Sequence, residues 1–534
     1  MEQQDLNKRL LLALALSFFV FIGYSYLFPQ APMAQQSEQS VQNRQNATPT
    51  PVTAKATPQP MQTKTQQAPT SAQTEVSNAL LNVVSPTFKM TFDTFGRIAQ
   101  YELLEDKYKD ADGNNLRILG ANEVKPLEIR FSDSALNTEA FQTPYTYEGE
   151  REVSLASGAK TLRFTQKLSS VTVTKILTIQ PNGAYHLRVE TSKPVAYFIT
   201  PGHRPMADTS MYMLVRGALI EGADGVILTV EDGDATGNER VEGAKIASAF
   251  DRYVATMFYN FKEGMNVSIL KESGDNPLLF VEGKQNLELG GYIGPKEHDI
   301  LASINPELTN AIEFGWFTFL SKPFFSVLLW LHHLIGNWGW AIILFTLLVK
   351  LVLFPLSYKG MMSMQKLKDL APKMKDLKEK YKNDPAKMNM KMMEMYKKEG
   401  ANPMGGCLPM LLQIPVFFAL YRVLLNADEL QGAVWISGWI DNLAAADPYY
   451  ILPILMGATM WFQQKITPNN FTDPLQEKIF QFFPLLMAFM FIVMPFPSGL
   501  VLYWVVNNIF TIGQQYIINK AYEKQKAEKS VSHK

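Results

Sequence analysis

Long apolar runs alternate with polar stretches along this chain, and their positions divide it into regions. Residues 9–28 form the first apolar run, beside the basic residues Lys8 and Arg9. The run exceeds the roughly 7–15 apolar residues of a secretory signal core, and no convincing small-residue cleavage motif follows it. The pattern predicts an uncleaved signal-anchor helix over residues 1–29, with its N-terminus in the cytoplasm.

The next region is polar. Residues 30–78 are rich in Gln, Thr, Ser, Pro and Ala and contain few large apolar side chains. Such a segment cannot bury enough surface to offset the entropy lost on ordering. We predict a disordered linker here.

Residues 79–312 change to an alternation of apolar and polar positions. The pattern is clear at 161–168, 170–179 and 184–190, and Pro181-Asn182-Gly183 separates the last two runs. Many short alternating runs bounded by turn residues are typical of an antiparallel β-sandwich or barrel. We predict a β-sandwich domain over 79–312, placed outside the cytoplasm by the anchor before it.

The C-terminal part is again apolar. Residues 313–337 combine aromatic residues with few charges and predict a helix at the membrane–water interface. Five further apolar helices are expected at 338–357, 407–426, 449–465, 479–494 and 498–518. With the anchor, they predict an α-helical bundle of six transmembrane spans, whose core comprises residues 338–519.

The charges between these helices predict the topology. Residues 358–403 carry twelve lysines against six acidic residues, whereas 427–448 contain no Lys or Arg. The tail, 520–534, is also basic. Because cytoplasmic loops of membrane proteins are enriched in Lys and Arg, we expect both termini in the cytoplasm and residues 30–312 outside it.

The basic segment 358–403 has a helical pattern of its own. Met361 and Met364 begin an apolar stripe at spacings of three and four, and Met388 and Met392 continue it after a break. The pattern predicts a cytoplasmic helical hairpin. The stripe is sufficient to join the two helices, and polarizable methionines also suit contact with varied apolar partners.

Composition limits the chemistry. The chain has 534 residues with 50 basic and 50 acidic side chains, so its net charge identifies no class of partner. Cys407 is the only cysteine, which excludes an intramolecular disulfide and a cysteine-rich metal site. His332 and His333 point about 100° apart on a helix, and no further ligands accompany them. We expect no metal, no cofactor, no catalytic residue and no enzymatic activity.

Lys350 is the most unusual residue, because it interrupts the apolar run 338–357. A charge in a span costs roughly 2.5–3.5 kcal/mol on insertion scales. Two interpretations remain open at this point. Lys350 extends its side chain to the interface, or it lies in a polar cavity within the membrane.

Other polar residues in the spans favour a cavity. Thr346 is on the same helix face as Lys350, and Gln413, Gln463 and Asn507 lie in later spans. The last five spans contain no Asp or Glu, so Lys350 has no carboxylate partner there. A cavity open to the cytoplasm and carrying a positive charge would attract the acidic outer segment of a nascent membrane protein.

Three segments resemble a known family. Residues 402–421 (NPMGGCLPMLLQIPVFFALY), 447–457 (DPYYILPILMG) and 496–503 (FPSGLVLY) closely resemble the YidC membrane-protein insertases. The likeness extends over roughly 313–520. The anchor, linker and outer β-domain resemble the Gram-negative form, in which the β-domain is a periplasmic sandwich similar to sugar-mutarotase folds.

The resemblance implies a function. It implies a multi-pass insertase and chaperone of the inner membrane that acts on nascent integral membrane proteins, alone or with the Sec translocon, and has no small-molecule substrate. The hairpin 358–403 would aid substrate capture. Independently of the resemblance, the positive charge of the tail suits contact with the RNA of the ribosome. The substrate groove would contain Lys350, Thr346, Gln413, Gln463, Tyr503, Trp504 and Asn507.

Two positions depart from the family pattern. Lys350 stands where the family usually has arginine, and Trp504 stands where tyrosine is frequent. Lysine keeps the charge but lacks the planar fork of a guanidinium group. Two other functions are alternatives, a small-solute transporter and a membrane-anchored periplasmic carbohydrate-binding protein. No repeat between the spans supports the transporter.

Overall fold

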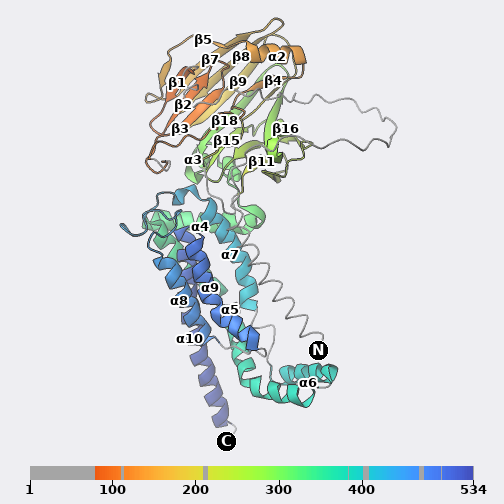
Figure 1. Ribbon diagram of the computed structural model, residues 1–534, viewed down its shortest axis with the longest axis vertical. Helices are drawn as coiled ribbons and strands as arrows, with labels where there is room; N and C mark the ends of the chain where they lie inside the picture. The colour runs from red at the N-terminus through yellow and green to blue at the C-terminus, as the bar shows by residue number, and fades with distance from the viewer. Residues whose placement is uncertain are drawn as a thin grey trace, which may run out of the picture. The chain divides into compact units, whose positions relative to one another are not determined.

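The structure is a computed structural model that describes residues 79–109, 113–207, 215–382, 384–400, 408–467, 474–494 and 496–532. The predicted signal anchor, the predicted linker and Cys407 lie outside these residues. The described chain contains a β-rich region followed by a helical region, which confirms the two fold classes expected from the sequence (Figure 1).

Three sheets form within the described residues of the β-rich region. The largest has the order β12 (Ile227–Glu231), β11 (Gly217–Glu221), β14 (Ile246–Phe250), β15 (Val254–Tyr259), β18 (Leu287–Pro295), β9 (Ala184–Thr191), β8 (Thr172–Ile179), β7 (Lys160–Lys167), β5 (Thr146–Tyr147). The second has the order β13 (Arg240–Ala244), β16 (Met265–Lys271), β17 (Pro277–Gly283), β10 (Tyr197–Ile199), β4 (Ile129–Phe131). The third has the order β3 (Ile98–Leu103), β2 (Phe88–Asp93), β1 (Ala79–Val84), β6 (Glu152–Ser154).

The alternating sequence pattern determines which side chains of these sheets are buried. Leu162 and Phe164 of β7 and Leu177 of β8 point inward and are fully buried. They share one hydrophobic core with residues of the other two sheets, such as Val83 and Val267. Because successive residues of a strand point to opposite faces, the apolar half of each run covers the core and the polar half faces solvent.

The turn between β8 and β9 depends on a glycine. Gly183 has φ +86, a left-handed conformation that glycine adopts readily. A Cβ at this position would lie 2.6 Å from the carbonyl oxygen of Ile293. The predicted turn at 181–183 is therefore fixed by backbone conformation and by the close approach of β18.

Short helices accompany the strands and connect them to the helical region. They are α2 (Ser134–Gln142), η2 (Ser273–Asp275), α3 (His298–Ile304), η3 (Pro306–Ala311) and η4 (Gly315–Phe317). The N-cap of α2 is Asp133, whose side chain accepts from the backbone N–H of Leu136 at 2.8 Å. Such a cap satisfies a donor that the first turn leaves free.

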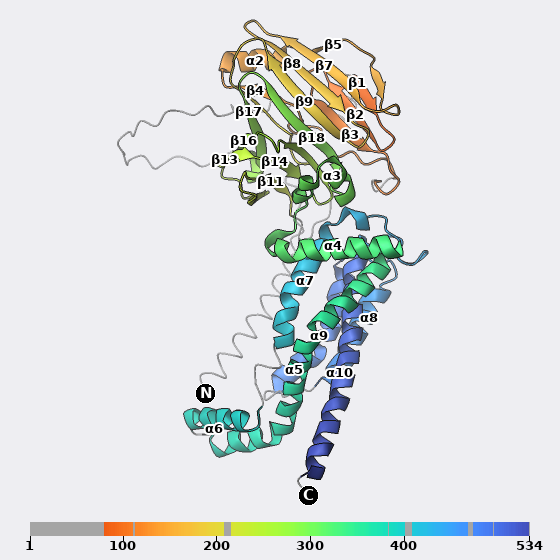
Figure 2. The same cartoon turned by 180° about the vertical axis from the view of Figure 1, so that it is seen from behind.

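Seven longer helices form the described part of the helical region. They are α4 (Thr318–Ile335), α5 (Trp338–Lys380), α6 (Pro385–Lys398), α7 (Leu408–Asn426), α8 (Ile451–Ile466), α9 (Pro474–Val493) and α10 (Ser498–Ser532). Helix α10 packs on α5 and α8, α9 packs on α8, and α4 packs on α5 and α7. The long helices lie side by side, with α4 across one end and α6 at the other (Figure 2).

Helix α4 corresponds to the predicted interfacial segment. It buries Phe325 and Leu328 and leaves Phe319 and Trp330 exposed. A helix with one apolar face buried and aromatic side chains outside suits the boundary between membrane and water. Its Pro323 lies in the second turn of the helix, where it lacks the N–H that would bond to the carbonyl of Phe319.

Helix α5 continues past the boundary expected at residue 357. It is 43 residues long and contains both the apolar run around Lys350 and the first helix of the predicted hairpin. A change from apolar to polar side chains alters the surroundings of a helix without interrupting its backbone hydrogen bonds. Among the described residues, only α5 is both long and apolar enough to cross a membrane, and 413–426 and 478–493 are shorter apolar helices.

Candidate functional site

Lys350 lies half-buried on α5 and contacts two other helices. Its Nζ donates to Thr511 Oγ1 on α10 at 2.9 Å. It also lies 3.4 Å from Gln413 Oε1 on α7. The ammonium group is therefore held by a hydroxyl and an amide from helices that are distant in sequence.

The polar contacts continue beyond the lysine. Gln413 Nε2 donates to the hydroxyl oxygen of Tyr503 at 2.9 Å, and Tyr503 is buried. Gln514 Nε2 donates to the carbonyl oxygen of Lys350 at 3.3 Å. We call Lys350, Gln413, Tyr503, Thr511 and Gln514 the Lys350 cluster. It joins α5, α7 and α10 through neutral polar groups around one positive charge.

Lys350 makes no ion pair with a carboxylate in the part of the chain that the structure describes. A buried charge is normally paired, because removal from water is costly. The neutral partners of Lys350 solvate its charge without cancelling it. The cluster can therefore attract a negatively charged group brought from outside.

Two predicted groove residues lie apart from this network. Thr346 is buried, and its Oγ1 donates to the carbonyl oxygen of Ile342 at 2.7 Å, one turn back in α5. Gln463 is half-buried on α8, and its backbone carbonyl accepts from Thr467 at the end of that helix. No hydrogen bond joins either side chain to Lys350 among the described residues.

Trp504 lies in an aromatic group rather than among polar side chains. Its ring centroid is 4.9 Å from that of Phe417 and 5.3 Å from that of Phe491. Aromatic pairs at such distances are favourable packing contacts. Trp504, Phe417 and Phe491 therefore form an aromatic wall, although Trp504 directly follows Tyr503 of the Lys350 cluster in the sequence.

Asn507 has a different character. Its Oδ1 is buried and has no hydrogen-bond partner among the residues that the structure describes, and its backbone carbonyl accepts from Thr511 Oγ1 at 2.7 Å. An unsatisfied buried acceptor costs about 1–3 kcal/mol. Such a group is ready to accept a donor from a water molecule or from a passing polypeptide.

Sequence reasoning did not identify Thr511 and Gln514 as site residues. A signal was present, because Tyr503, Asn507, Thr511 and Gln514 follow one another at spacings of four, four and three. Residues at these spacings lie on one face of a helix. The sequence therefore predicts a polar face on α10, but it does not predict which residues of α5 that face contacts.

The hairpin methionines have mixed surroundings. Met392 packs with the buried pair Leu370 and Tyr396 between α5 and α6. Met361 is buried, whereas Met364 and Met388 are half-buried. The exposed methionines of the hairpin are two others, Met390 and Met393, at 54% and 64% exposure. The inner stripe joins the helices, and part of the methionine surface remains available.

Polar contacts connect the hairpin to the C-terminal helix. Gln365 Nε2 donates to Asn519 Oδ1. Asp369 Oδ2 accepts from the hydroxyl of Tyr522 at 3.0 Å and from Lys526 Nζ at 2.7 Å. Burial alone would raise the pKa of Asp369, but its bonds to Lys526 and Tyr522 outweigh that effect and hold the pKa below its usual value.

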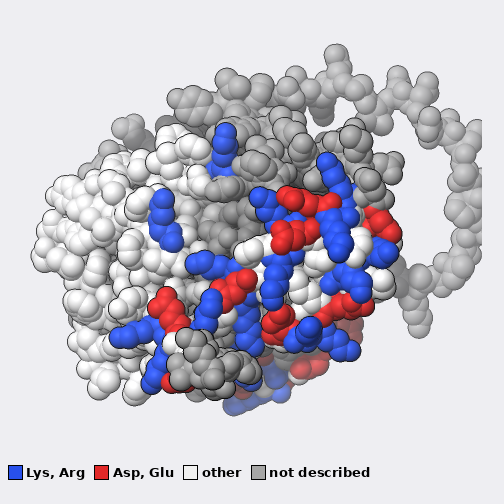
Figure 3. Space-filling view, turned by 90° about the horizontal axis from the view of Figure 1, so that it is seen from below, with Lys and Arg blue, Asp and Glu red and all other residues white. Residues whose placement is uncertain are grey.

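The surface at this end of the helical region is strongly charged. Seen from below, Lys and Arg side chains alternate with Asp and Glu, whereas much of the neighbouring surface is uncharged (Figure 3). Mixed charge of this kind is compatible with exposure to water. It contrasts with the apolar surface expected where helices face lipid.

Known proteins resemble this chain over nearly its full length. Residues 330–526 match the family model described as 60Kd inner membrane protein, and residues 253–327 match the YidC periplasmic domain. A Campylobacter jejuni protein named "Membrane protein insertase YidC" is 47% identical over 98% of both chains. Proteins of the same name from Wolinella succinogenes and Helicobacter pylori are 46% and 42% identical, covering 98% of this chain and 97% and 98% of their own.

Proposed function

The chain belongs to the YidC family of membrane protein insertases, and we propose that it carries out insertion through a hydrophilic groove built around the Lys350 cluster. The observation that carries this proposal is a positive charge held by Thr511 and Gln413 without an anionic partner among the described residues. An incoming acidic segment supplies the missing negative charge.

The physical benefit lies in the path that a substrate follows. A polar segment crossing hydrocarbon loses its hydration, and each charged residue costs several kcal/mol. A groove lined by Lys350, Tyr503 and Asn507 replaces part of that hydration. Coulomb attraction is stronger in a low dielectric than in water, so a single lysine favours acidic segments. No nucleotide or covalent step is needed.

The neighbouring residues take supporting roles in this proposal. Thr346 and Gln463 line the groove without contacting Lys350, and the aromatic wall at Trp504 covers apolar parts of the substrate. Asn507 Oδ1 accepts a backbone N–H of the extended chain. The substrate is an integral membrane protein during its synthesis.

We infer that six spans cross the inner membrane with both termini in the cytoplasm and residues 30–312 in the periplasm. The distribution of Lys and Arg supports this topology. The segment 358–403 and the tail are basic, whereas the loop 427–448 contains acidic residues and no Lys or Arg. Cysteines introduced at Lys387 and Asp441 in a Cys407→Ser background test it. Lys387→Cys should react only from the cytoplasm and Asp441→Cys only from the periplasm.

The hairpin 358–403 is proposed to capture apolar substrate segments before they enter the bilayer. Met390 and Met393 offer exposed, polarizable side chains for this contact, while Met361, Met364, Met388 and Met392 shape the hairpin. Replacing both exposed methionines by serine should lower the yield of crosslinks between hairpin and substrate more than it lowers the insertion rate.

We propose two larger partners, the first from the resemblance and the second from the charge of the tail. We propose that the protein acts alone on short translocated segments and with the Sec translocon on larger substrates. The basic residues of the tail contact ribosomal RNA electrostatically, so this contact should weaken as salt rises. Cosedimentation with ribosomes at increasing salt, with and without residues 520–534, measures it.

The test of the main proposal is insertion into liposomes that contain only this protein. A radiolabelled substrate with a short acidic outer segment should become protected from protease, and protein-free liposomes should give no more than background. Equal protection in both would contradict the proposal. A Lys350→Glu protein provides the matched control for the charge.

A further inference from the structure

We propose that Glu123, His203 and Glu272 form a binding site for a divalent metal ion of the Zn²⁺ type in the β-rich region. The three residues are 80 and 69 positions apart in sequence, and none belongs to the Lys350 cluster. The site is independent of the insertase proposal, because it involves other residues and a different ligand.

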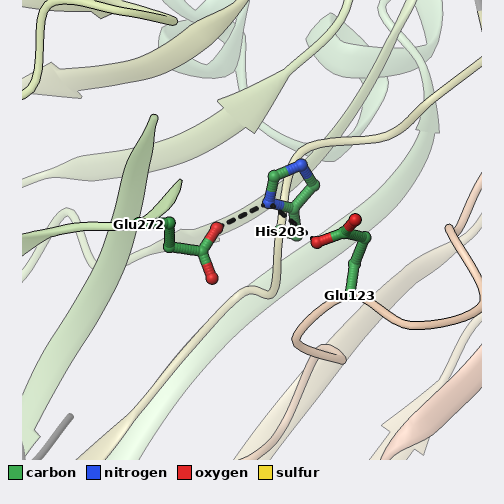
Figure 4. A group of neighbouring side chains, drawn as sticks. All are labelled: Glu123, His203 and Glu272. Carbon is green, nitrogen blue, oxygen red and sulfur yellow. Dashed lines mark hydrogen bonds and ion pairs between the residues drawn. The ribbon is translucent and has the colours of Figure 1, made fainter. Parts of the chain in front are cut away.

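The geometry of the ligand atoms supports a metal. His203 Nδ1 lies 2.8 Å from Glu272 Oε2 and 3.7 Å from Glu123 Oε2 (Figure 4). All three ligand atoms lie within 4.8 Å of one another. Ligands bound tetrahedrally to zinc at about 2.0–2.1 Å are separated from each other by roughly 3.4 Å. Small side-chain rotations therefore bring all three atoms into coordination.

A hydrogen bond explains only part of this arrangement. Nδ1 of an imidazole carries one proton or one lone pair. It can bond to Glu272 at 2.8 Å, but the same atom cannot also bond to Glu123 at 3.7 Å. Two carboxylates converge on one ring nitrogen, as in Figure 4. A cation between the three groups would use both carboxylates and the nitrogen lone pair.

The backbone holds the three side chains in place from three separate segments. Glu123 lies between β3 and β4, His203 follows β10, and Glu272 comes directly after β16. The backbone N–H of His203 donates to the carbonyl oxygen of Val124 at 2.8 Å, which joins two of the segments.

Gly202 permits this close approach. It has φ +95, and a Cβ there would lie 2.7 Å from the backbone nitrogen of Pro126. On the third segment, the backbone N–H of Glu272 donates to Asn276 at 2.9 Å and closes the turn around η2. The ligand positions are therefore set by the fold before any ion arrives, which limits the ordering cost of binding.

Burial and charge also fit. The side chain of His203 is 8% exposed, that of Glu272 is 20% exposed and that of Glu123 is 39% exposed. The partly open side allows a water molecule to complete four-fold coordination. One neutral imidazole and two carboxylates give the site a charge of −2 before binding. Imidazole nitrogen favours Zn²⁺ and similar ions over Mg²⁺ and Ca²⁺, which prefer oxygen ligands.

A metal here would act as a structural clip. It would connect the residue after β16 with the segments after β3 and β10, which contacts of His203 with Glu272 and Glu123 already bring together. Because the ion would bind the folded state and not the unfolded chain, it would stabilise the β-rich region. It would leave the groove chemistry unchanged.

The test uses the full-length protein in detergent, freed of metal by a chelator and then titrated with Zn²⁺ in a calorimeter. We expect one strong site. Glu123→Gln, His203→Gln and Glu272→Gln should each weaken it by at least about tenfold, since even second-shell losses reach that size. His186→Gln, which changes an exposed histidine on β9, is the matched control and should bind as the wild type does.

Thermal unfolding gives a second readout. Zn²⁺ should raise the unfolding midpoint of the wild type and of His186→Gln equally, and that of Glu123→Gln by less at the same zinc concentration. Glu123→Gln retains the bond between His203 and Glu272, so it should fold even if His203→Gln does not. Unchanged zinc affinity in Glu123→Gln, or no strong site in the wild type, would show that the cluster is only a hydrogen-bonded group.

Discussion

The Nζ of Lys350 donates to the Oγ1 of Thr511 at 2.9 Å, although 161 residues separate them in the chain. This bond fixes where the positive charge of α5 lies relative to α10. The charge is held in place and still lacks an anion among the described residues. The proposed groove depends on both properties, and they can be separated by mutation.

The sign of the charge at residue 350 is the first property to test. Lys350→Arg should retain insertion, whereas Lys350→Glu should slow insertion of substrates with acidic outer segments by at least about tenfold, equivalent to 1.4 kcal/mol. Attraction then becomes repulsion in a low dielectric. Protease protection in proteoliposomes measures this. A substrate with a neutral outer segment serves as the control, and equal slowing of both substrates would remove the electrostatic mechanism.

The position of the charge is tested by Thr511→Val. Valine has nearly the same shape but no hydroxyl, so Lys350 keeps only the longer contact with Gln413. We expect a loss of insertion rate of at least about tenfold, since one hydrogen bond to a charged group contributes about 1.5–3 kcal/mol and 1.4 kcal/mol corresponds to tenfold. Thr511→Ser should behave as the wild type. If valine and serine have equal rates, the bond does not position Lys350.

The neighbouring residues Asn507 and Asn508 differ in whether their side chains are hydrogen-bonded. Asn507 Oδ1 is buried and accepts no hydrogen bond from the described part of the chain, whereas Asn508 Nδ2 donates to Thr459 Oγ1 at 3.2 Å. Asn507→Leu should leave stability unchanged or raise it, and should lower the insertion rate. Asn508→Leu should lower the unfolding midpoint, because it leaves Thr459 without this donor. Unfolding in detergent and insertion in liposomes, measured on the same preparations, distinguish the two.

Glu429 makes stability depend on pH. It lies in η6 (Asp428–Leu430), and its Oε1 accepts from the backbone N–H of His298 at 2.8 Å. Burial raises its pKa from 4.5 to about 7. Between these values the folded protein holds a proton that the unfolded chain has released. The stabilisation is therefore full below pH 4.5 and is lost as pH rises through about 7.

Glu429→Gln removes this titration and keeps an acceptor for His298. The unfolding midpoint of the variant should exceed that of the wild type at pH 8 and should approach it at pH 5. The exposed Glu150→Gln is the control and should follow the wild type at both pH values. A constant difference between wild type and Glu429→Gln across this range would show that Glu429 does not titrate there.

Lys175 tests the packing of the β-rich region. It lies on the core side of β8, is 1% exposed, and its Nζ donates to the carbonyl oxygens of Phe95, Gly96 and Leu127. Lys175→Met should cost about 1–3 kcal/mol, because buried carbonyls lose a donor. Thermal unfolding followed by circular dichroism should show a lower midpoint. Lys167→Met, at an exposed position of β7, should stay within about 0.5 kcal/mol of the wild type.

The sequence allowed much of the β-rich region to be predicted. The runs at 161–168 and 184–190 correspond to β7 and β9, because period-two alternation reports directly which face of a strand is buried. Lys175 is an exception within this pattern. It occupies a core position of β8, and nothing local indicated that three backbone carbonyls from other segments would surround its amino group.

The candidate sites were less predictable, for a physical reason. A charge in an apolar run marks Lys350 without any structure, but its partner Thr511 depends on the alignment of α5 and α10. Side-chain packing along the whole interface sets that alignment. The group at His203 was missed for the same reason, because its ligands come from three segments that only the folded sheets bring together.

Helix α5 has a mechanical consequence. At about 1.5 Å per residue, its 43 residues measure about 65 Å along the helix. No loop separates Lys350 from the hairpin helix that packs against α6, so force applied to the hairpin reaches the groove through one continuous helix, which bends before it runs beside α6 (Figure 2). Only Pro355 and Pro372 interrupt the hydrogen-bond ladder and permit bending. A ligand that pulls on the hairpin therefore shifts or rotates Lys350, unless α5 bends at one of these prolines instead.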